Sequence, residues 1–550
     1  MNKIFDLWKN HHRVSKELKQ EMELMNEEEV SVAFNEAELG FGTAGYRAKM
    51  GPGNHYLNEL TYQQLTEGYA RFLVNKFGSK AKALVVHDNR RNAKLFTNIA
   101  ANTLTSYGIE VFLTENNELL PTPIASYLIP HLGCHGAINI TASHNPKEYN
   151  GFKCYDETGC QMLPEDSKKV IEFMPTWAEI LDKNIVAEPS LIHELDSSLI
   201  EKYFVEVQEY LDIKPTDKPI KVVYTSMHGT ASKYMPDFIR SLGHECIVVE
   251  SQTYPDENFT NTPICNPEDP RALEQAVNLA NQENVNLIFA TDPDADRLGV
   301  AVKKDGQWIF LNGNQAGIIE TYYRIKPLSE KYSGTPVVIS TYISTNLIDR
   351  IAKAYNGKVI RTATGFKWVG DQINKLTKND VYVNGFEEAI GALPTALNRD
   401  KDSFQTAALI LKIVSEYAEK GMDLIDILEK EIYPTYGHWY GVTTSLIIPG
   451  LDWKVKATKM MNQLKTFDQP QILNRKVTKV VYNEAGSCLE YHFENDSWVK
   501  FRLSGTEPKF KIYTNLYDDN SLGVYDPNIS LQLEQESKAI VQFISNFLGI

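Results

Sequence analysis

Short runs of β-branched and other apolar residues recur along most of the chain. Clear examples are residues 83–86, 222–225, 287–290, 337–340 and 381–383. Each run ends in a polar or glycine-containing turn, and residues 92–105 and 403–419 show the apolar spacing of helices. This repeated order of strand, loop and helix predicts parallel α/β sheets rather than a β-sandwich.

The C-terminal part of the chain has a different pattern. Residues 477–504 alternate apolar and polar positions on both sides of a turn at 484–487, which predicts an antiparallel ribbon. Residues 537–549 then predict a closing helix. A chain of 550 residues is long enough for three or four domains. We place their boundaries near residues 205, 315 and 440.

Composition and charge exclude several classes of protein. The chain is 43% hydrophobic and 23% charged, which is typical of a soluble globular protein. Its formal net charge of -15 argues against broad electrostatic binding to nucleic acid or to anionic membranes. We find no signal peptide, and no apolar run of about 18 residues. The six cysteines form no CxxC pair, which favours reduced thiols. We therefore expect a cytoplasmic protein in which any anionic ligand needs a local basic pocket.

Three alternating carboxylates follow one of the predicted strands. Asp292, Asp294 and Asp296 come directly after the strand, and ligands of parallel sheets bind at the carboxyl ends of strands. Carboxylates this close repel one another unless a cation lies among them, and oxygen ligands favour a hard ion such as Mg²⁺. An EF-hand is excluded, because Arg297 replaces its glycine and Lys303 its final glutamate. The alternative is a solvated acidic turn.

Ser143 follows another apolar run, in a turn that also contains His144 and Pro146. Such a turn is expected to expose the hydroxyl, but no GxSxG elbow surrounds it, so a hydrolase-type nucleophile is not indicated. A phosphoryl group on Ser143 would supply a further ligand to a metal held by the aspartates. Lys153 could then donate or accept a proton near that phosphate. An ordinary turn serine and a solvated surface lysine are the alternatives.

One short loop near the C-terminus combines groups that bind phosphate. It provides a guanidinium, two hydroxyls, a glycine and a following lysine: Arg502, Ser504, Gly505, Thr506 and Lys511. Such groups form a plausible cradle for a phosphate, which a negatively charged protein can bind only at a local basic site.

Two further loops carry candidate sugar ligands. One presents Thr364, Gly365 and Lys367, and the other presents Glu387 and Glu388. Carboxylates of this kind accept hydrogen bonds from vicinal sugar hydroxyls. Taken singly, a lysine loop and a pair of glutamates are most often surface features.

Four of these motifs, in the order TASHNP, TDPDADR, GFEEAIG and RLSGTEP, resemble those of the α-D-phosphohexomutase superfamily, the phosphoglucomutases and phosphomannomutases. FGTAGYR, which ends at Arg47, and GFKWVG are similar to motifs of its longer branch, which includes phosphoglucomutase and phosphopentomutase-like members. The resemblance implies three similar α/β domains, with mixed or parallel sheets, and a C-terminal α+β domain around a central cleft. We expect these domains at residues 1–205, 206–315, 316–440 and 441–550.

The resemblance also implies roles for individual residues. Those matching the family's catalytic groups are Ser143 as the phosphoserine and a metal ligand, Asp292, Asp294 and Asp296 as ligands of one Mg²⁺ ion, Lys153 as a general acid or base, and the adjacent His144 and Arg297. Those matching its substrate-binding groups are Arg47, Thr364, Gly365, Lys367, Glu387, Arg502, Ser504, Gly505, Thr506 and Lys511.

The chain departs from the family pattern in the glutamate loop. Ala389 stands where many members have serine, and Gly391 stands where they have histidine, so this loop offers no second proton-transfer group. Lys401, in the segment RDKDS, is our candidate, because some phosphoglucomutases use a lysine in a comparable segment.

The implied activity is that of a mutase interconverting a hexose 1-phosphate and a hexose 6-phosphate, with a sugar 1,6-bisphosphate as intermediate and activator. Glucose phosphates are the first choice; mannose phosphates, or ribose and deoxyribose phosphates, are alternatives within the same chemistry. A sugar bisphosphate synthase or phosphatase is an alternative of a different class, and a non-enzymatic binding protein is the least favoured. The expected partners are small-molecule sugar phosphates, with the chain a monomer or a small homo-oligomer.

Overall fold

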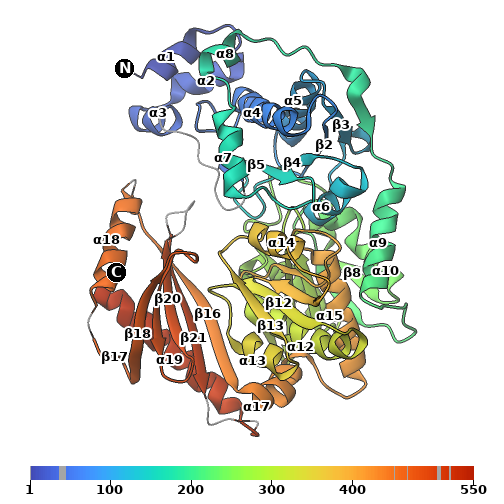
Figure 1. Cartoon of the computed structure of the whole chain (residues 1–550), viewed down its shortest axis with the longest axis vertical. Coiled ribbons are helices and arrows are strands. Elements are labelled where there is room, and N and C mark those ends of the chain that lie inside the picture. Colours follow the sequence, from blue (N-terminus) through green and yellow to red (C-terminus); the bar gives the residue numbers. More distant parts are fainter. Residues whose placement is uncertain are drawn as a thin grey trace. The chain divides into compact units, whose positions relative to one another are not determined.

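The computed structural model describes residues 2–35, 45–450, 452–467, 469–503, 509–518, 522–524 and 526–549. The chain forms two compact units, Met1–Val300 with Thr395–Ala408, and Ala301–Pro394 with Leu409–Ile550. Four sheets follow one another along the sequence (Figure 1). The predicted class, α/β with a C-terminal α+β domain, is confirmed. The four domain boundaries stay a prediction.

The first sheet is mixed and has the strand order β1-β5-β4-β2-β3-β6. Its strands are β1 (Tyr46–Lys49), β2 (Lys82–His87), β3 (Glu110–Leu113), β4 (Gly136–Ile140), β5 (Tyr149–Asp156) and β6 (Ile192–Glu194). Strand β2 pairs in parallel with β3 and β4, whereas β5 pairs antiparallel with β4 and β1. The loops that leave the carboxyl ends of β2 and β4 therefore start at the same edge of the sheet.

Several helices of the first unit pack on this sheet or on one another. They are α1 (Lys3–Asn10), α2 (Lys16–Leu24), α3 (Glu27–Ala33), α4 (Glu59–Phe77), α5 (Ala93–Thr105), α6 (Thr122–His131), α7 (Pro164–Glu172) and α8 (Trp177–Asp182). Helix α4 packs on α5, where the rings of Tyr62 and Phe96 stack with centroids 3.9 Å apart. Trp8 anchors a separate apolar cluster that joins the N-terminal helices to α8. Residues 92–105, predicted as a helix, are α5 within one residue.

The second sheet has the order β11-β10-β9-β7-β8. Its strands are β7 (Lys221–Thr225), β8 (Glu245–Val248), β9 (Leu287–Thr291), β10 (Leu298–Lys304) and β11 (Gln307–Leu311), with helices α9 (Ser198–Tyr210), α10 (Met235–Ser241) and α11 (Glu274–Gln282). Strand β7 pairs in parallel with β8 and β9. Both strands predicted in this region are present, and the three aspartates follow directly after β9.

The third sheet, in the second unit, has the order β13-β12-β14-β15. Its strands are β12 (Thr335–Thr341), β13 (Lys358–Thr362), β14 (Asp380–Phe386) and β15 (Ala392–Leu393). The helices of this region are α12 (Gly313–Lys331), α13 (Leu347–Ala354), α14 (Lys367–Asn374), α15 (Ser403–Ala418), α16 (Leu424–Asp426) and α17 (Tyr433–Tyr436). Strand β12 pairs in parallel with β13 and β14, so loops with Thr364 and Glu387 leave the same edge of the sheet.

The fourth sheet is antiparallel, with the order β16-β21-β20-β19-β18-β17. Its strands are β16 (His438–Ile447), β17 (Gln471–Ile472), β18 (Arg475–Asn483), β19 (Cys488–Phe493), β20 (Trp498–Leu503) and β21 (Lys509–Asp518). Helices α18 (Trp453–Lys465) and α19 (Pro527–Leu548) pack on it (Figure 1). The predicted ribbon is confirmed, and the closing helix is present but begins at Pro527 rather than at 537, because Asp526 caps it there.

Two findings bear on the expected environment of the chain. All six cysteines are buried, and none of them forms a disulfide bond. In the described part of the chain, no helix combines the length and the apolar character needed to cross a bilayer.

Candidate active site

The loop after β9 places Asp292, Asp294 and Asp296 in one buried cluster. None of the three is more than 1% exposed, and one carboxylate oxygen of each lies within 4.8 Å of the others. The alternative of a solvated acidic turn is therefore wrong. The Oδ1 atoms of Asp294 and Asp296 are buried without a hydrogen-bond partner. Buried carboxylate oxygens without donors fit a hard cation, so this set of oxygen ligands can hold Mg²⁺.

The charges around the cluster divide the carboxylates into two kinds. Burial, and then repulsion from Asp294 and Asp296, raises the pKa of Asp292 well above its usual value. Burial also favours a raised pKa for Asp294 and Asp296. The ammonium groups of Lys153 and Lys401 outweigh this effect, so the pKa of each of these two carboxyl groups is lowered. These two carboxylates therefore keep the negative charge that a cation requires.

Ser143 lies in the loop after β4, directly beside the aspartates. Its Oγ donates a hydrogen bond to Asp292 Oδ2 at 2.8 Å and lies 3.2 Å from His144 Nδ1. The expected exposure of the hydroxyl is wrong, since Ser143 is 1% exposed. The reason is that Asp292, 149 residues away in the sequence, covers the turn. The turn and the metal loop thus form one site.

Two buried lysines contact the same carboxylates. Lys153, in β5, has its Nζ 2.6 Å from Asp294 Oδ2 and 3.6 Å from Asp296 Oδ2, and it is 1% exposed, which excludes a surface lysine. Lys401 has its Nζ 2.9 Å from Asp296 Oδ2 and 3.1 Å from Asp400 Oδ1. The segment Thr395–Ala408 belongs to the first unit, although we expected Lys401 in the domain of the sugar loop. Both candidate proton-transfer groups therefore lie at the acidic cluster.

The other expected cations of the first unit lie around the serine loop. The backbone N–H of Arg297 donates to Asp292 Oδ1 at 3.1 Å, and its Nη1 contacts His144 Nδ1. Arg47, in β1, donates from Nη1 to Asn145 Oδ1 at 3.1 Å. Residues 41–44 of the FGTAGYR motif lie outside the described residues.

Several polar residues of the site were not predicted from the sequence. Thr122 donates from Oγ1 to Asp294 Oδ2 at 3.1 Å, and Tyr155 donates from its hydroxyl to Asp400 Oδ2 at 2.8 Å. Arg90 donates to the carbonyl oxygen of Ser143 at 2.6 Å and to Asp88 Oδ2 at 3.1 Å. Asp88 follows the predicted strand at 83–86 by two residues, so its position near the end of the strand was a usable signal. Thr122 and Tyr155 occur within regular elements and carried no such signal.

In the second unit, the structure brings together the two expected sugar loops. Glu387, after β14, accepts a hydrogen bond at 2.7 Å from the backbone N–H of Gly365, which has a φ of 112°. Glu387 is 7% exposed and Glu388 9%, so neither is the surface residue of the alternative interpretation. Lys367 is also buried, at the start of α14. Thr364 immediately precedes Gly365, so both lie at this contact.

The expected phosphate loop is described only at its flanks. Arg502, in β20, is the cross-strand partner of Lys511 in β21. Like charges directly opposite one another destabilise a sheet, and an anion bound beside this pair would offset their repulsion. Ser504, Gly505 and Thr506 lie outside the described residues.

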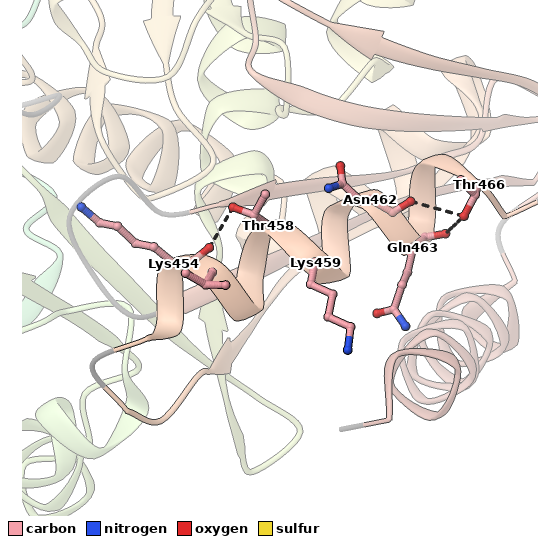
Figure 2. A pocket seen from close by; sticks show the side chains of 7 residues that line it. Lys454, Thr458, Lys459, Asn462, Gln463 and Thr466 are labelled. Atoms are coloured by element: carbon pink, nitrogen blue, oxygen red, sulfur yellow. Dashed lines mark hydrogen bonds between the residues drawn. The ribbon is translucent and has the colours of Figure 1, made fainter.

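A separate surface hollow of about 680 Å³ lies along α18 (Figure 2). It is lined by Lys454, Val455, Thr458, Lys459, Asn462, Gln463 and Thr466. The hydroxyls of Thr458 and Thr466 donate hydrogen bonds to backbone carbonyl oxygens of α18, as Figure 2 shows. None of the motif residues lines this hollow, so we place no catalytic function there.

Family comparisons cover most of the chain. Sequence models of phosphoglucomutase/phosphomannomutase match in three parts: alpha/beta/alpha domain I at residues 38–180, domain II at 201–306 and domain III at 312–434. These ranges contain Ser143, the three aspartates and Glu387, respectively.

Relatives and solved structures agree with that match. The chain is 42% identical to the phosphomannomutase of Mycoplasmoides pirum, over 100% of both chains. It is 33% identical to the phosphoglucomutase of Staphylococcus epidermidis, over 88% of this chain and 91% of that one. Among solved structures, a phosphoglucomutase/phosphomannomutase family protein from Burkholderia thailandensis has a TM-score of 0.67 at 18% identity, with 92% of this chain and 97% of that one covered. Parafusin, a phosphoglucomutase from Paramecium, has a TM-score of 0.67 at 19% identity, with 94% and 97% covered. These two likenesses concern the fold.

Proposed function

The chain belongs to the phosphoglucomutase/phosphomannomutase family, a family of mutases, and from this premise we propose that it interconverts a hexose 1-phosphate and a hexose 6-phosphate through a phosphorylated Ser143. One observation carries the proposal. The Ser143 hydroxyl is hydrogen-bonded at 2.8 Å to a carboxylate of a cluster that fits Mg²⁺ and that two buried lysines contact.

The first step is phosphoryl transfer from Ser143 to the free hydroxyl of the sugar monophosphate. The bond between phosphorus and Ser143 Oγ breaks as the bond to the sugar oxygen forms. The proton of the sugar hydroxyl passes to a lysine in its neutral amine form, and Ser143 Oγ takes a proton from a lysine in its ammonium form; Lys153 and Lys401 are the candidates for these two roles. When bound at the aspartates, Mg²⁺ supplies neutralisation of charge on the transferring group.

The second step reverses the first with the other phosphate. The bisphosphate intermediate turns over and returns its other phosphoryl group to Ser143, which leaves the isomeric monophosphate as product. The two lysines exchange their roles as proton acceptor and proton donor in this step, so each returns to its starting protonation state, and this exchange would use both of the lysines at the cluster. The intermediate would also restore phosphoserine when supplied from outside, so a sugar 1,6-bisphosphate is the proposed activator.

Residues of the second unit are proposed to bind the part of the sugar that does not react. Glu387 would accept hydrogen bonds from sugar hydroxyls through the carboxylate oxygen that Gly365 leaves free. Thr364 and Lys367 flank this contact. Arg502 and Lys511, with Ser504, Gly505 and Thr506, would hold the non-reacting phosphate.

Glucose phosphates remain our first choice of substrate, and mannose phosphates are the second candidate because the Mycoplasmoides pirum relative is a phosphomannomutase. The test is a mutase assay on glucose, mannose, ribose and deoxyribose 1-phosphates, each with Mg²⁺ and its bisphosphate. We expect catalytic efficiency for one hexose to exceed that for either pentose by at least about tenfold, since a lost contact to a hydroxyl costs about 1–3 kcal/mol. A preference for pentoses would reject the hexose assignment, and release of free phosphate alone would make the protein a phosphatase.

The Arg502→Ala variant tests the phosphate loop. Removing a charge-assisted hydrogen bond of about 1.5–3 kcal/mol is expected to raise KM roughly 10- to 100-fold, with a smaller effect on kcat. Arg271→Ala is the matched control, because Arg271 is an exposed arginine of a short 3₁₀ helix, and among the described residues its ion pair is with Asp269. An Arg502→Ala variant with the KM of the parent protein would remove Arg502 from the substrate site.

A further inference from the structure

The loop that carries Ser143 has a backbone that needs support. It connects β4 to β5 between residues 141 and 148, outside both strands. Ser143 has a φ of 52°, in the left-handed region that costs a residue with a side chain about 1–3 kcal/mol. Its backbone N–H is satisfied by Thr141 Oγ1 at 2.8 Å. Carbonyl groups in such a loop are outside any ladder of hydrogen bonds, so other donors must satisfy them.

A single guanidinium satisfies three of these carbonyl groups and that of Tyr149, the first residue of β5. Arg90 follows β2, at the same edge of the sheet. Its Nη2 donates to the carbonyl oxygens of Ser143 at 2.6 Å and Asn145 at 2.5 Å, and its Nη1 donates to those of Pro146 at 2.8 Å and Tyr149 at 2.9 Å. Its Nε donates to Asp88 Oδ2 at 3.1 Å. An arginine side chain has five N–H donors, so all of them are used.

The Arg90 side chain is fully buried, and its N–H donors are not available to a ligand. Its side chain is 0% exposed, and the guanidinium lies 5.3 Å from the centroid of the Phe259 ring. Asp88 balances its charge and also accepts the Arg90 backbone N–H at 2.9 Å. A buried ion pair contributes little net stability, whereas the planar fork of an arginine fixes the positions of the groups it bonds.

We infer that Arg90 is a positioning residue, which holds the Ser143 loop in the conformation that sets the serine hydroxyl against Asp292. The inference rests on the proposed function of Ser143. It goes beyond that function in assigning the geometry of the serine hydroxyl to a residue that contacts the serine loop through backbone carbonyl groups.

Arg90→Lys tests this inference, because lysine keeps the charge but cannot reach four carbonyl groups and a carboxylate at once. We expect kcat to fall about 100-fold, the effect of misplacing a reacting group by about 1 Å. KM is expected to change less than about threefold, since substrate binding does not involve Arg90. Hydrogen exchange at the amides of residues 141–149 should become faster than in the parent protein.

Arg13→Lys is the matched control, because Arg13 also bonds backbone carbonyl groups of a distant segment. Its Nη1 donates to the carbonyl oxygens of Ile180, at 2.6 Å, and Lys183. This variant is expected to lower Tm without changing kcat. Were Arg90→Lys unable to fold, Asp88→Asn would take its place, since it keeps the guanidinium but weakens its orientation; a smaller loss of kcat at constant KM is then expected.

The outcomes separate this inference from the proposed function. An Arg90→Lys enzyme with the parent kcat, or with a raised KM and unchanged kcat, would overturn the positioning role. A parent protein inactive on every sugar phosphate would instead reject the proposed function. Hydrogen exchange of residues 141–149 would still report whether Arg90 holds the loop.

Discussion

Replacement of Ser143 by alanine is expected to lower kcat by at least about a thousandfold, because the group that carries the phosphoryl in both half-reactions is lost. The substitution removes one hydroxyl and its 2.8 Å hydrogen bond to Asp292, so Tm should change by only a few degrees. Mutase activity is measured with a saturating sugar 1,6-bisphosphate, so that inactivity does not result from a shortage of the phosphoryl donor.

Ser167→Ala is the control for this variant. Ser167 is a buried serine whose hydroxyl donates to the Leu163 carbonyl oxygen at 3.0 Å, within the first unit but on α7. Its loss should affect stability to a similar degree and leave kcat unchanged. Retention of full turnover by Ser143→Ala would mean that the phosphoryl group does not pass through this serine.

Asp294→Asn is expected to give the second large effect. The substitution removes a charge and a carboxylate oxygen from the set that fits Mg²⁺, and it leaves the Lys153 ammonium facing a neutral amide. Several kcal/mol of charge stabilisation in the transition state depend on the metal, so kcat should fall roughly a thousandfold. Calorimetric titration of the apo protein with Mg²⁺ should also show affinity reduced at least about tenfold.

Asp305→Asn is the matched control for the aspartate variant. Asp305 has a φ of 50° in the turn between β10 and β11, a conformation that asparagine adopts as readily. This variant should keep both the magnesium affinity and kcat, and removal of magnesium by a chelator should reversibly inactivate it and the parent protein alike. An Asp294→Asn variant with unchanged magnesium affinity would require another metal site.

Local sequence pattern was sufficient to predict the strand-end loops of the site. Asp292 follows a run of buried strand residues, and Ser143 follows another, so their place at the carboxyl ends of strands could be predicted from periodicity alone. The pairing of Glu387 with Gly365 agrees with the same reasoning, since β13 and β14 flank one strand in parallel.

Contacts between distant segments could not be predicted in this way. Ser143 is buried because Asp292 covers it, and Lys401 reaches Asp296 because residues 395–408 return to the first unit. Nothing in the sequence around Arg90 indicates that its guanidinium N–H groups donate to carbonyl groups more than fifty residues away in the chain. These features depend on tertiary packing, which a pattern read within short windows does not contain.

The most direct measurement is to incubate the parent protein with a radiolabelled sugar 1,6-bisphosphate, map the labelled peptide, and chase with unlabelled hexose 1-phosphate. The mechanism predicts label on the peptide that contains Ser143, and its transfer to the sugar during the chase at a rate no slower than kcat. Label on another residue, or label on Ser143 that does not pass to the sugar, would contradict the phosphoserine mechanism.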